Sequence, residues 1–122
     1  MPDFEAIAAR YIDSWNKRDA TARRAALEQV WAENGRYTDP FVETEGLDAI
    51  DATIANAQGL FPDFVFRLAG PVDGHHGFCR FAWELGPEGA AEAPIAGYDV
   101  AVVGPGGEFQ RVVGFLDRMP AD

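Results

Sequence analysis

The chain has 122 residues, and its 20 acidic against 10 basic residues give a formal net charge of −10. This length predicts one domain spanning residues 1–122. The acidic balance excludes nucleic acid and anionic membrane surfaces as expected partners, since both are recognised by basic surfaces.

Two further features bear on the compartment. No uninterrupted apolar run approaches the roughly 20 residues that cross a bilayer, and the acidic N-terminus lacks the basic and apolar regions of a signal peptide. Cys79 is the only cysteine, so no internal disulfide can form. We therefore expect a cytoplasmic protein that contacts no membrane.

Three segments carry helical patterns. Apolar residues recur at helical spacing over residues 4–15, and Asp3 precedes them as an N-cap. A second helix is predicted to start near residue 19 or 21 and to stop at Asn34-Gly35. A third is predicted over residues 47–57, before a glycine and a proline that end it.

The remaining segments read as strands separated by glycine- and proline-rich turns. They are residues 36–39, 64–69, 77–85, 96–103 and 109–116. Short turns favour antiparallel neighbours. This order of elements predicts an α+β domain in which helices pack on one face of an antiparallel sheet.

Alternation along the strands assigns side chains to faces. In residues 77–85 the face predicted to lie under the helices carries Cys79, Phe81, Trp83 and Leu85, and the outer face carries Phe78, Arg80, Ala82 and Glu84. Asp99 alternates with Ala101 and Val103, which places it on the inner face. We expect the outer face to form a homodimer interface.

Asp39 is the first candidate for chemistry, because it stands between the aromatic residues Tyr37 and Phe41. In an apolar pocket its pKa would rise toward the working pH, as a general base requires. Alternatively, Asp39-Pro40 starts a turn and the carboxylate accepts from nearby amides.

Three other residues have two readings each. Asp99 is either a partner acid, a hydrogen-bond donor or a second base, or else an aspartate that points outward or pairs with Arg80 or Arg111. Tyr11 is either a donor to an oxyanion or an ordinary core tyrosine. His75 and His76 are adjacent and form a poor chelate, so no metal is expected, but His76 is a candidate acid or base if it reaches the pocket.

Several motifs are spread along almost the whole chain: residues 10–19, Tyr37-Thr38-Asp39-Pro40, residues 46–50, Phe61-Pro62-Asp63-Phe64, Arg80-Phe81-x-Trp83, Gly97-Tyr98-Asp99 and residues 107–117. With these motifs the chain resembles the nuclear transport factor two-like superfamily and, within it, the SnoaL-like polyketide cyclases and the ketosteroid isomerases. The resemblance implies a cone-shaped fold with three N-terminal helices on a curved, mostly antiparallel sheet. It also implies Asp39 as general base, with Tyr11 and a protonated Asp99 as oxyanion donors.

The expected function is that of a small cofactor-free isomerase or cyclase, which abstracts a proton next to a carbonyl of an apolar molecule. The residues expected to bind that molecule are aromatic: Trp15, Tyr37, Phe41, Phe61, Phe64, Trp83 and Phe115. One alternative is a non-catalytic ligand-binding or dimeric assembly module. Another is epoxide-hydrolase-like water activation, which needs an arginine, Arg80 or Arg67, beside Asp99.

Overall fold

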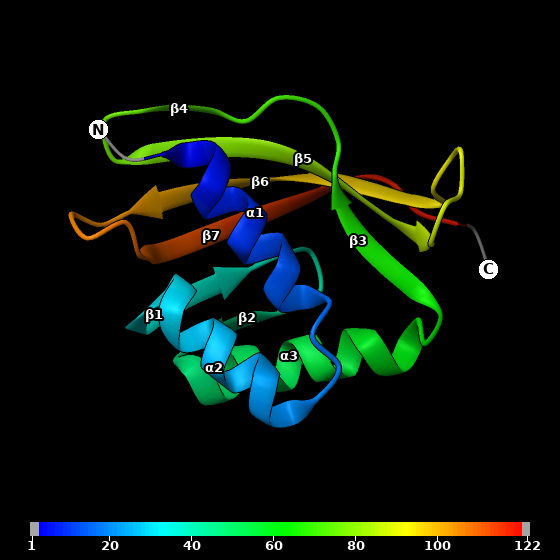
Figure 1. The fold of residues 1–122 in the computed structure, drawn as a ribbon, viewed down its shortest axis with the longest axis horizontal. Helices are drawn as coiled ribbons and strands as arrows, with labels where there is room; N and C mark the ends of the chain where they lie inside the picture. The colour runs from blue at the N-terminus through cyan, green and yellow to red at the C-terminus, as the bar shows by residue number, and fades with distance from the viewer. Residues whose placement is uncertain (1–2, 121–122) are drawn as a thin grey trace.

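The computed structural model describes residues 3–120 of the chain. Within these residues two helices are followed by two strands, a third helix and five further strands (Figure 1). The helices are α1 (Phe4–Trp15), α2 (Ala20–Val30) and α3 (Leu47–Leu60), and the strands are β1 (Trp31–Thr38), β2 (Glu43–Glu45), β3 (Phe64–Leu68), β4 (Asp73–His75), β5 (Phe78–Pro87), β6 (Ile95–Val103) and β7 (Phe109–Arg118). Within residues 3–120, no helix is both long and apolar enough to cross a bilayer.

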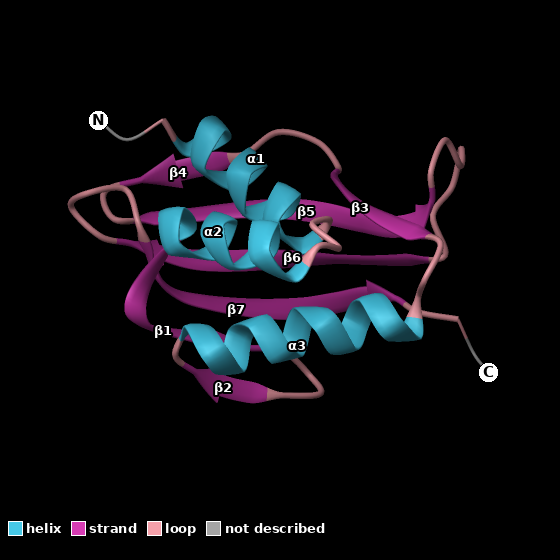
Figure 2. Cartoon of the chain, turned by 60° about the horizontal axis from the view of Figure 1, so that its bottom comes forward, coloured by secondary structure: helices cyan, strands magenta, loops and turns pink. Residues whose placement is uncertain are grey.

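The strands form one sheet with the order β2-β1-β7-β6-β5-β3, and β4 pairs with the end of β5. Every pair is antiparallel except β1 with β7, which is parallel. The three helices lie on the same face of this sheet (Figure 2). The α+β class and the packing of helices on a mostly antiparallel sheet are confirmed.

Helix α1 forms where its pattern predicts. The carboxylate of Asp3 accepts a hydrogen bond from the backbone N–H of Ala6 at 3.1 Å and caps the helix. Its apolar face, which includes Tyr11 and Trp15, is buried against the sheet. The ring of Tyr11 lies at the centre of an aromatic cluster, 5.6 Å from Phe81 and 5.2 Å from Phe109 between ring centroids.

The predicted end of the second helix at Asn34-Gly35 is wrong. Helix α2 ends at Val30, and strand β1 starts with Trp31 in extended geometry. Gly35 serves the strand, because a Cβ there would lie 2.4 Å from the indole of Trp31, which crosses the backbone at this point. A glycine chosen for close packing has the same sequence signature as a helix stop.

The face assignments made from alternation are confirmed. Cys79, Phe81 and Leu85 are buried on the inner face, and Arg80 is exposed on the outer one. Asp99 is 3% exposed on the inner face. Burial raises the pKa of the Cys79 thiol to about 11, so this side chain is a small buried hydrophobe.

The outer face of β5, β6 and β7 carries large apolar side chains in the open. Phe78, Tyr98, Val100 and Phe115 are each more than a third exposed. The rings of Tyr98 and Phe115 stack across the two strands with centroids 5.1 Å apart. Arg80 and Arg111 share this face, next to Val100 and Val102 on the neighbouring strand.

Candidate functional site

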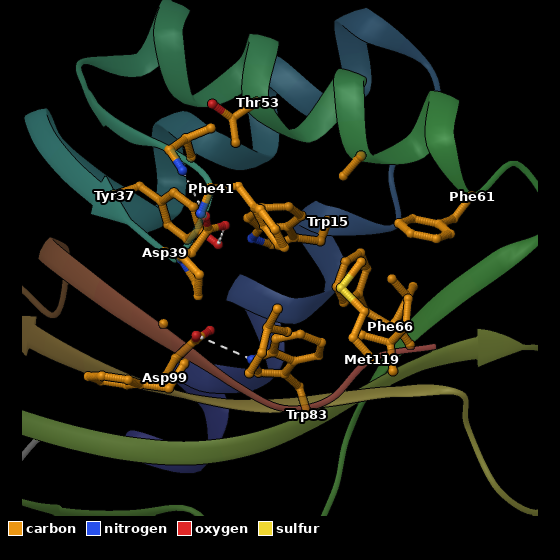
Figure 3. A pocket seen from close by; sticks show the side chains of 18 of the residues that line it. Trp15, Tyr37, Asp39, Phe41, Thr53, Phe61, Phe66, Trp83, Asp99 and Met119 are labelled. Carbon is orange, nitrogen blue, oxygen red and sulfur yellow. Dashed lines mark hydrogen bonds between the residues drawn. The ribbon is translucent and has the colours of Figure 1, made fainter. Parts of the chain in front are cut away.

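A pocket of about 240 Å³ opens between α1, α3 and the inner face of the sheet (Figure 3). Apolar side chains make most of its wall. The polar ones are few: Tyr11, Tyr37, Asp39, Thr53, Asn56, the indoles of Trp15 and Trp83, and Asp99. A mostly apolar pocket with a few convergent polar groups is the usual form of a small-molecule site.

Asp39 and Asp99 enter this pocket from one rung of the sheet. Asp99 on β6 pairs with Gly114 on β7. On the other side of β7, Thr38 pairs with Val113, so Asp39 follows beside Gly114. A Cβ on Gly114 would lie 2.7 Å from Asp99 Oδ1 and 3.6 Å from Asp39 Cβ. The missing side chain leaves room for the Asp99 carboxylate against the backbone of β7, next to Asp39.

Asp99 is the buried acid of the pair. The indole Nε1–H of Trp83 donates to its Oδ1 at 3.2 Å (Figure 3). Loss of water on burial raises the pKa of Asp99 from 3.8 to about 7, and the charge of Asp39 raises it too, whereas the side chains of Trp83 and Tyr11 lower it. Asp99 therefore exchanges its proton near neutral pH.

Asp39 lies in a different environment from Asp99, because three donors bind its carboxylate. The hydroxyl of Tyr37 donates to its Oδ2 at 2.7 Å, and the backbone N–H groups of Phe41 and Val42 donate to its Oδ1 at 2.8 and 3.0 Å. Its own N–H donates to the carbonyl of Val42 at 2.9 Å. Asp39 thus lies in the pocket wall and also fastens a turn, so the two sequence readings describe one side chain.

Both tyrosines are kept neutral. Burial, followed by the charge of Asp99, raises the pKa of Tyr11 and of Tyr37 well above the ordinary value. Their hydroxyl groups therefore stay protonated and act as hydrogen-bond donors at neutral pH. Tyr11, on α1, and Asp99, on β6, reach the pocket from opposite layers of the fold.

Five of the seven aromatic residues expected to bind a ligand line the pocket with residues of the inner face: Trp15, Tyr37, Phe41, Phe61 and Trp83. Phe115 also borders the pocket, but its ring stacks on Tyr98 on the outer face of the sheet. Phe64 does not line it, which corrects that prediction. Its ring stacks on Phe61 with centroids 5.4 Å apart. Phe66, two residues further along β3, lines the pocket instead and contacts Trp15 and Trp83.

The structure brings neither histidine to the pocket, which corrects the expectation that His76 reaches it. His76 is exposed between β4 and β5, in a turn where its φ is +52°. The Nδ1 atoms of His75 and His76 lie 3.0 Å apart, away from the pocket lining. Within residues 3–120, no three side chains of the metal-binding types form a group that could hold an ion.

No arginine joins the two acids. Arg80 is exposed and lies 3.4 Å from Asp73, while Arg67 pairs with Glu84 at 2.8 Å. Among residues 3–120, no lysine, arginine or histidine lines the pocket. The arrangement that epoxide-hydrolase-like water activation requires is therefore not formed by these side chains.

Among the lining residues absent from the sequence-based site are Gly114, Phe66, Leu60 and Met119. Gly114 had a usable signal, since a glycine inside a strand often marks a close approach. Phe66 belongs to a strand in which aromatic residues alternate, but the phase was not fixed by sequence. Leu60 and Met119 line the pocket from the ends of α3 and β7, where no periodicity extends.

Comparison with known proteins identifies the family. A family model described as a SnoaL-like domain matches residues 8–112. A candidate isomerase of the SnoaL-like family from Agrobacterium tumefaciens str. C58 is 41% identical, over 93% of this chain and 97% of its own, and its structure superimposes with a TM-score of 0.87. The chain belongs to the SnoaL-like family, and the resemblance noted from its motifs is confirmed.

More distant structures share the fold. A SnoaL-like protein of unknown function from Burkholderia thailandensis E264 is 14% identical, with 93% of each chain covered and a TM-score of 0.72. A candidate polyketide cyclase from Sinorhizobium meliloti is also 14% identical, with 93% and 94% covered and a TM-score of 0.69. No curated protein matches the chain.

Proposed function

We propose that the pocket binds an apolar molecule bearing a carbonyl group and catalyses proton transfer at a neighbouring carbon, with Asp99 as the proton acceptor. One observation carries this assignment: Asp99 is buried at the wall of an apolar pocket, and its pKa is raised to about 7. A general base works best when its pKa lies near the operating pH.

The proposed step uses few groups. Ionised Asp99 takes a proton from the carbon next to the carbonyl, and the electron pair of that C–H bond moves into an enolate. The neutral hydroxyl of Tyr11, which neighbours Asp99, donates to the enolate oxygen. Trp83 holds Oδ1 of Asp99 and leaves Oδ2 to carry the proton. Return of the proton from Asp99 to another carbon of a conjugated enolate gives isomerisation. Attack by the enolate carbon on a second carbonyl carbon of the same molecule gives ring closure, in which the C=O π bond of that carbonyl breaks and its oxygen takes the proton from Asp99.

This proposal moves the base from Asp39, where the sequence resemblance had placed it, to Asp99. Three donors already engage the Asp39 carboxylate, namely Tyr37 and the amides of Phe41 and Val42. These hydrogen bonds occupy most of the acceptor positions of that carboxylate, so few are left for a group of the substrate. We assign Asp39 to holding the turn and to keeping a negative charge beside the pocket.

A non-catalytic ligand-binding module of the same fold is the second candidate, and the same hydrogen bonds of Asp39 favour it. An aspartate that holds a turn together does not have to take part in a reaction. The two candidates differ in whether Asp99 exchanges protons with a bound molecule.

The distinguishing experiment needs no known substrate. Neutral ketones are incubated with the protein in D₂O, and exchange at the carbons beside the carbonyl is followed by NMR. We expect Asp99→Asn to lower the catalysed rate by about 10²–10⁴, the usual contribution of a general base. Asp63→Asn is the matched control, since it makes the same change at an exposed aspartate outside the pocket lining. Exchange that is equally fast without the Asp99 carboxylate would end the catalytic proposal.

We also propose that two copies of the chain pair through the outer face of β5, β6 and β7. The exposed apolar side chains there, Tyr98 and Phe115 among them, lie on one face of the three strands. Association would remove this surface from water, which is favourable in proportion to the apolar area.

A further inference from the structure

The pocket has a mouth made of exposed apolar side chains. Phe41, in the turn after β1, is 68% exposed; Leu60, at the end of α3, is 66% exposed; and Met119, after β7, is 46% exposed. All three line the pocket. Three separate segments therefore place large, exposed apolar groups in the pocket lining, although exposure of such groups to water is unfavourable. We take these three residues as the mouth of the pocket.

The charged side chains in the described pocket lining are all acidic. The pocket lining described within residues 3–120 contains two carboxylates and no cationic side chain. An anionic ligand would have to lie near Asp39 and Asp99 without a compensating charge, in a site where burial strengthens repulsion. The lining is therefore suited to a neutral molecule and disfavours carboxylates and phosphates.

The size of the pocket limits what it can enclose. Ligand pockets commonly hold about 300–1,000 Å³, whereas this one holds about 240 Å³. A ligand with its carbonyl between Tyr11 and Asp99 fills the interior with few further atoms. Any longer apolar part of the ligand has to extend out through the mouth, where it would contact Leu60 and Met119.

Building on the proposed function, we propose that the substrate is a neutral carbonyl compound with an extended apolar tail, and that Phe41, Leu60 and Met119 bind this tail at the mouth. The reactive end lies inside, beside Asp99, and the tail covers side chains that are otherwise in water. These three residues then set the length of the molecule that binds best.

The test is a binding series that does not depend on turnover. Methyl ketones with alkyl chains from propyl to nonyl are titrated against the protein, and binding is read from the fluorescence of Trp15 and Trp83, which line the pocket. A fully buried methylene strengthens binding about fourfold. At a half-open mouth we expect about twofold for each added methylene.

Variants separate the mouth from the interior. Leu60→Ser should weaken binding of the nonyl ketone by about fivefold and that of the propyl ketone by less than twofold, on the same area scale. Val100→Ser is the matched control, since it removes an exposed apolar side chain from the opposite face. The fatty-acid anion of the same length should bind at least about tenfold more weakly than the nonyl ketone at pH 8, and Asp99→Asn should restore part of that loss.

Each outcome decides one point. Any one of four results would overturn the proposed tail site. The first two are equal affinity for all ketones of the series and equal affinity for the nonyl ketone and the fatty-acid anion. The others are an unchanged dependence of affinity on chain length in Leu60→Ser, and no saturable fluorescence change with any ketone. The proton-exchange experiment decides the catalytic role of Asp99 separately. Long ketones that bind as expected but exchange no protons would refute the catalysis and leave the tail site standing.

Discussion

Replacing Asp99 with asparagine should stabilise the protein at neutral pH. The rise in the pKa of Asp99 from 3.8 to about 7 means that folding holds a proton that the unfolded chain has already released above pH 3.8. Each pKa unit corresponds to about 1.4 kcal/mol, so ionising this group in the folded protein costs about 4 kcal/mol. The cost is absent below pH 3.8, grows as the pH rises, and is complete above about pH 7.

Urea unfolding at a series of pH values measures this directly. The free energy of unfolding of Asp99→Asn minus that of the natural chain should rise by up to about 4 kcal/mol between pH 4 and pH 8. The same difference for Asp63→Asn, which changes an exposed aspartate, should stay nearly constant. A flat difference for Asp99→Asn would show that burial does not hold the proton on this carboxyl, and the proposed base would lose its physical support.

Other changes test the parts around this acid. Trp83→Phe removes a donor that lowers the pKa of Asp99, so the pH at half-maximal proton exchange should move upward by about one unit, as a pH–rate profile would reveal. Gly114→Ala places a methyl 2.7 Å from Asp99 Oδ1. It should lower the free energy of unfolding by about 1–3 kcal/mol and weaken ketone binding at least about tenfold. Gly59→Ala is the control, because a Cβ there meets no atom within 4 Å. Tyr98→Glu should halve the mass measured by light scattering if the outer face pairs two copies, and an unchanged mass would refute that interface.

The sequence patterns correctly predicted the features that depend only on residues close together along the chain. The inward direction of Asp99 follows from alternation with Ala101 and Val103, and the start of α1 follows from its Asp3 cap. The boundary after α2 was missed for a tertiary reason. Gly35 accommodates the indole of Trp31 within a strand, and a pattern of single residues cannot distinguish this from a helix stop.

The candidate site depends on a contact that local patterns do not contain. Asp39 meets Asp99 only because β1 pairs in parallel with β7, which follows it by about 70 residues along the chain. The sequence order of helices and short turns predicts antiparallel neighbours and gives no register for this pair. The role of Gly114 follows from the same pairing, since it matters only when acids lie on both sides of it.

The two acids of this rung show how environment divides their roles. Three hydrogen-bond donors engage Asp39, which is half-buried, whereas Asp99 is 3% exposed and has only the side chains of Trp83, at 3.2 Å, and Tyr11 to offset its burial. Donors stabilise a carboxylate and loss of water destabilises it, so Asp99 is the acid whose pKa is raised into the neutral range. The residue with the stronger sequence signal, Asp39, has that signal because Asp-Pro begins a turn. The residue suited to exchange a proton is the one whose surroundings supply too few donors to hold its charge.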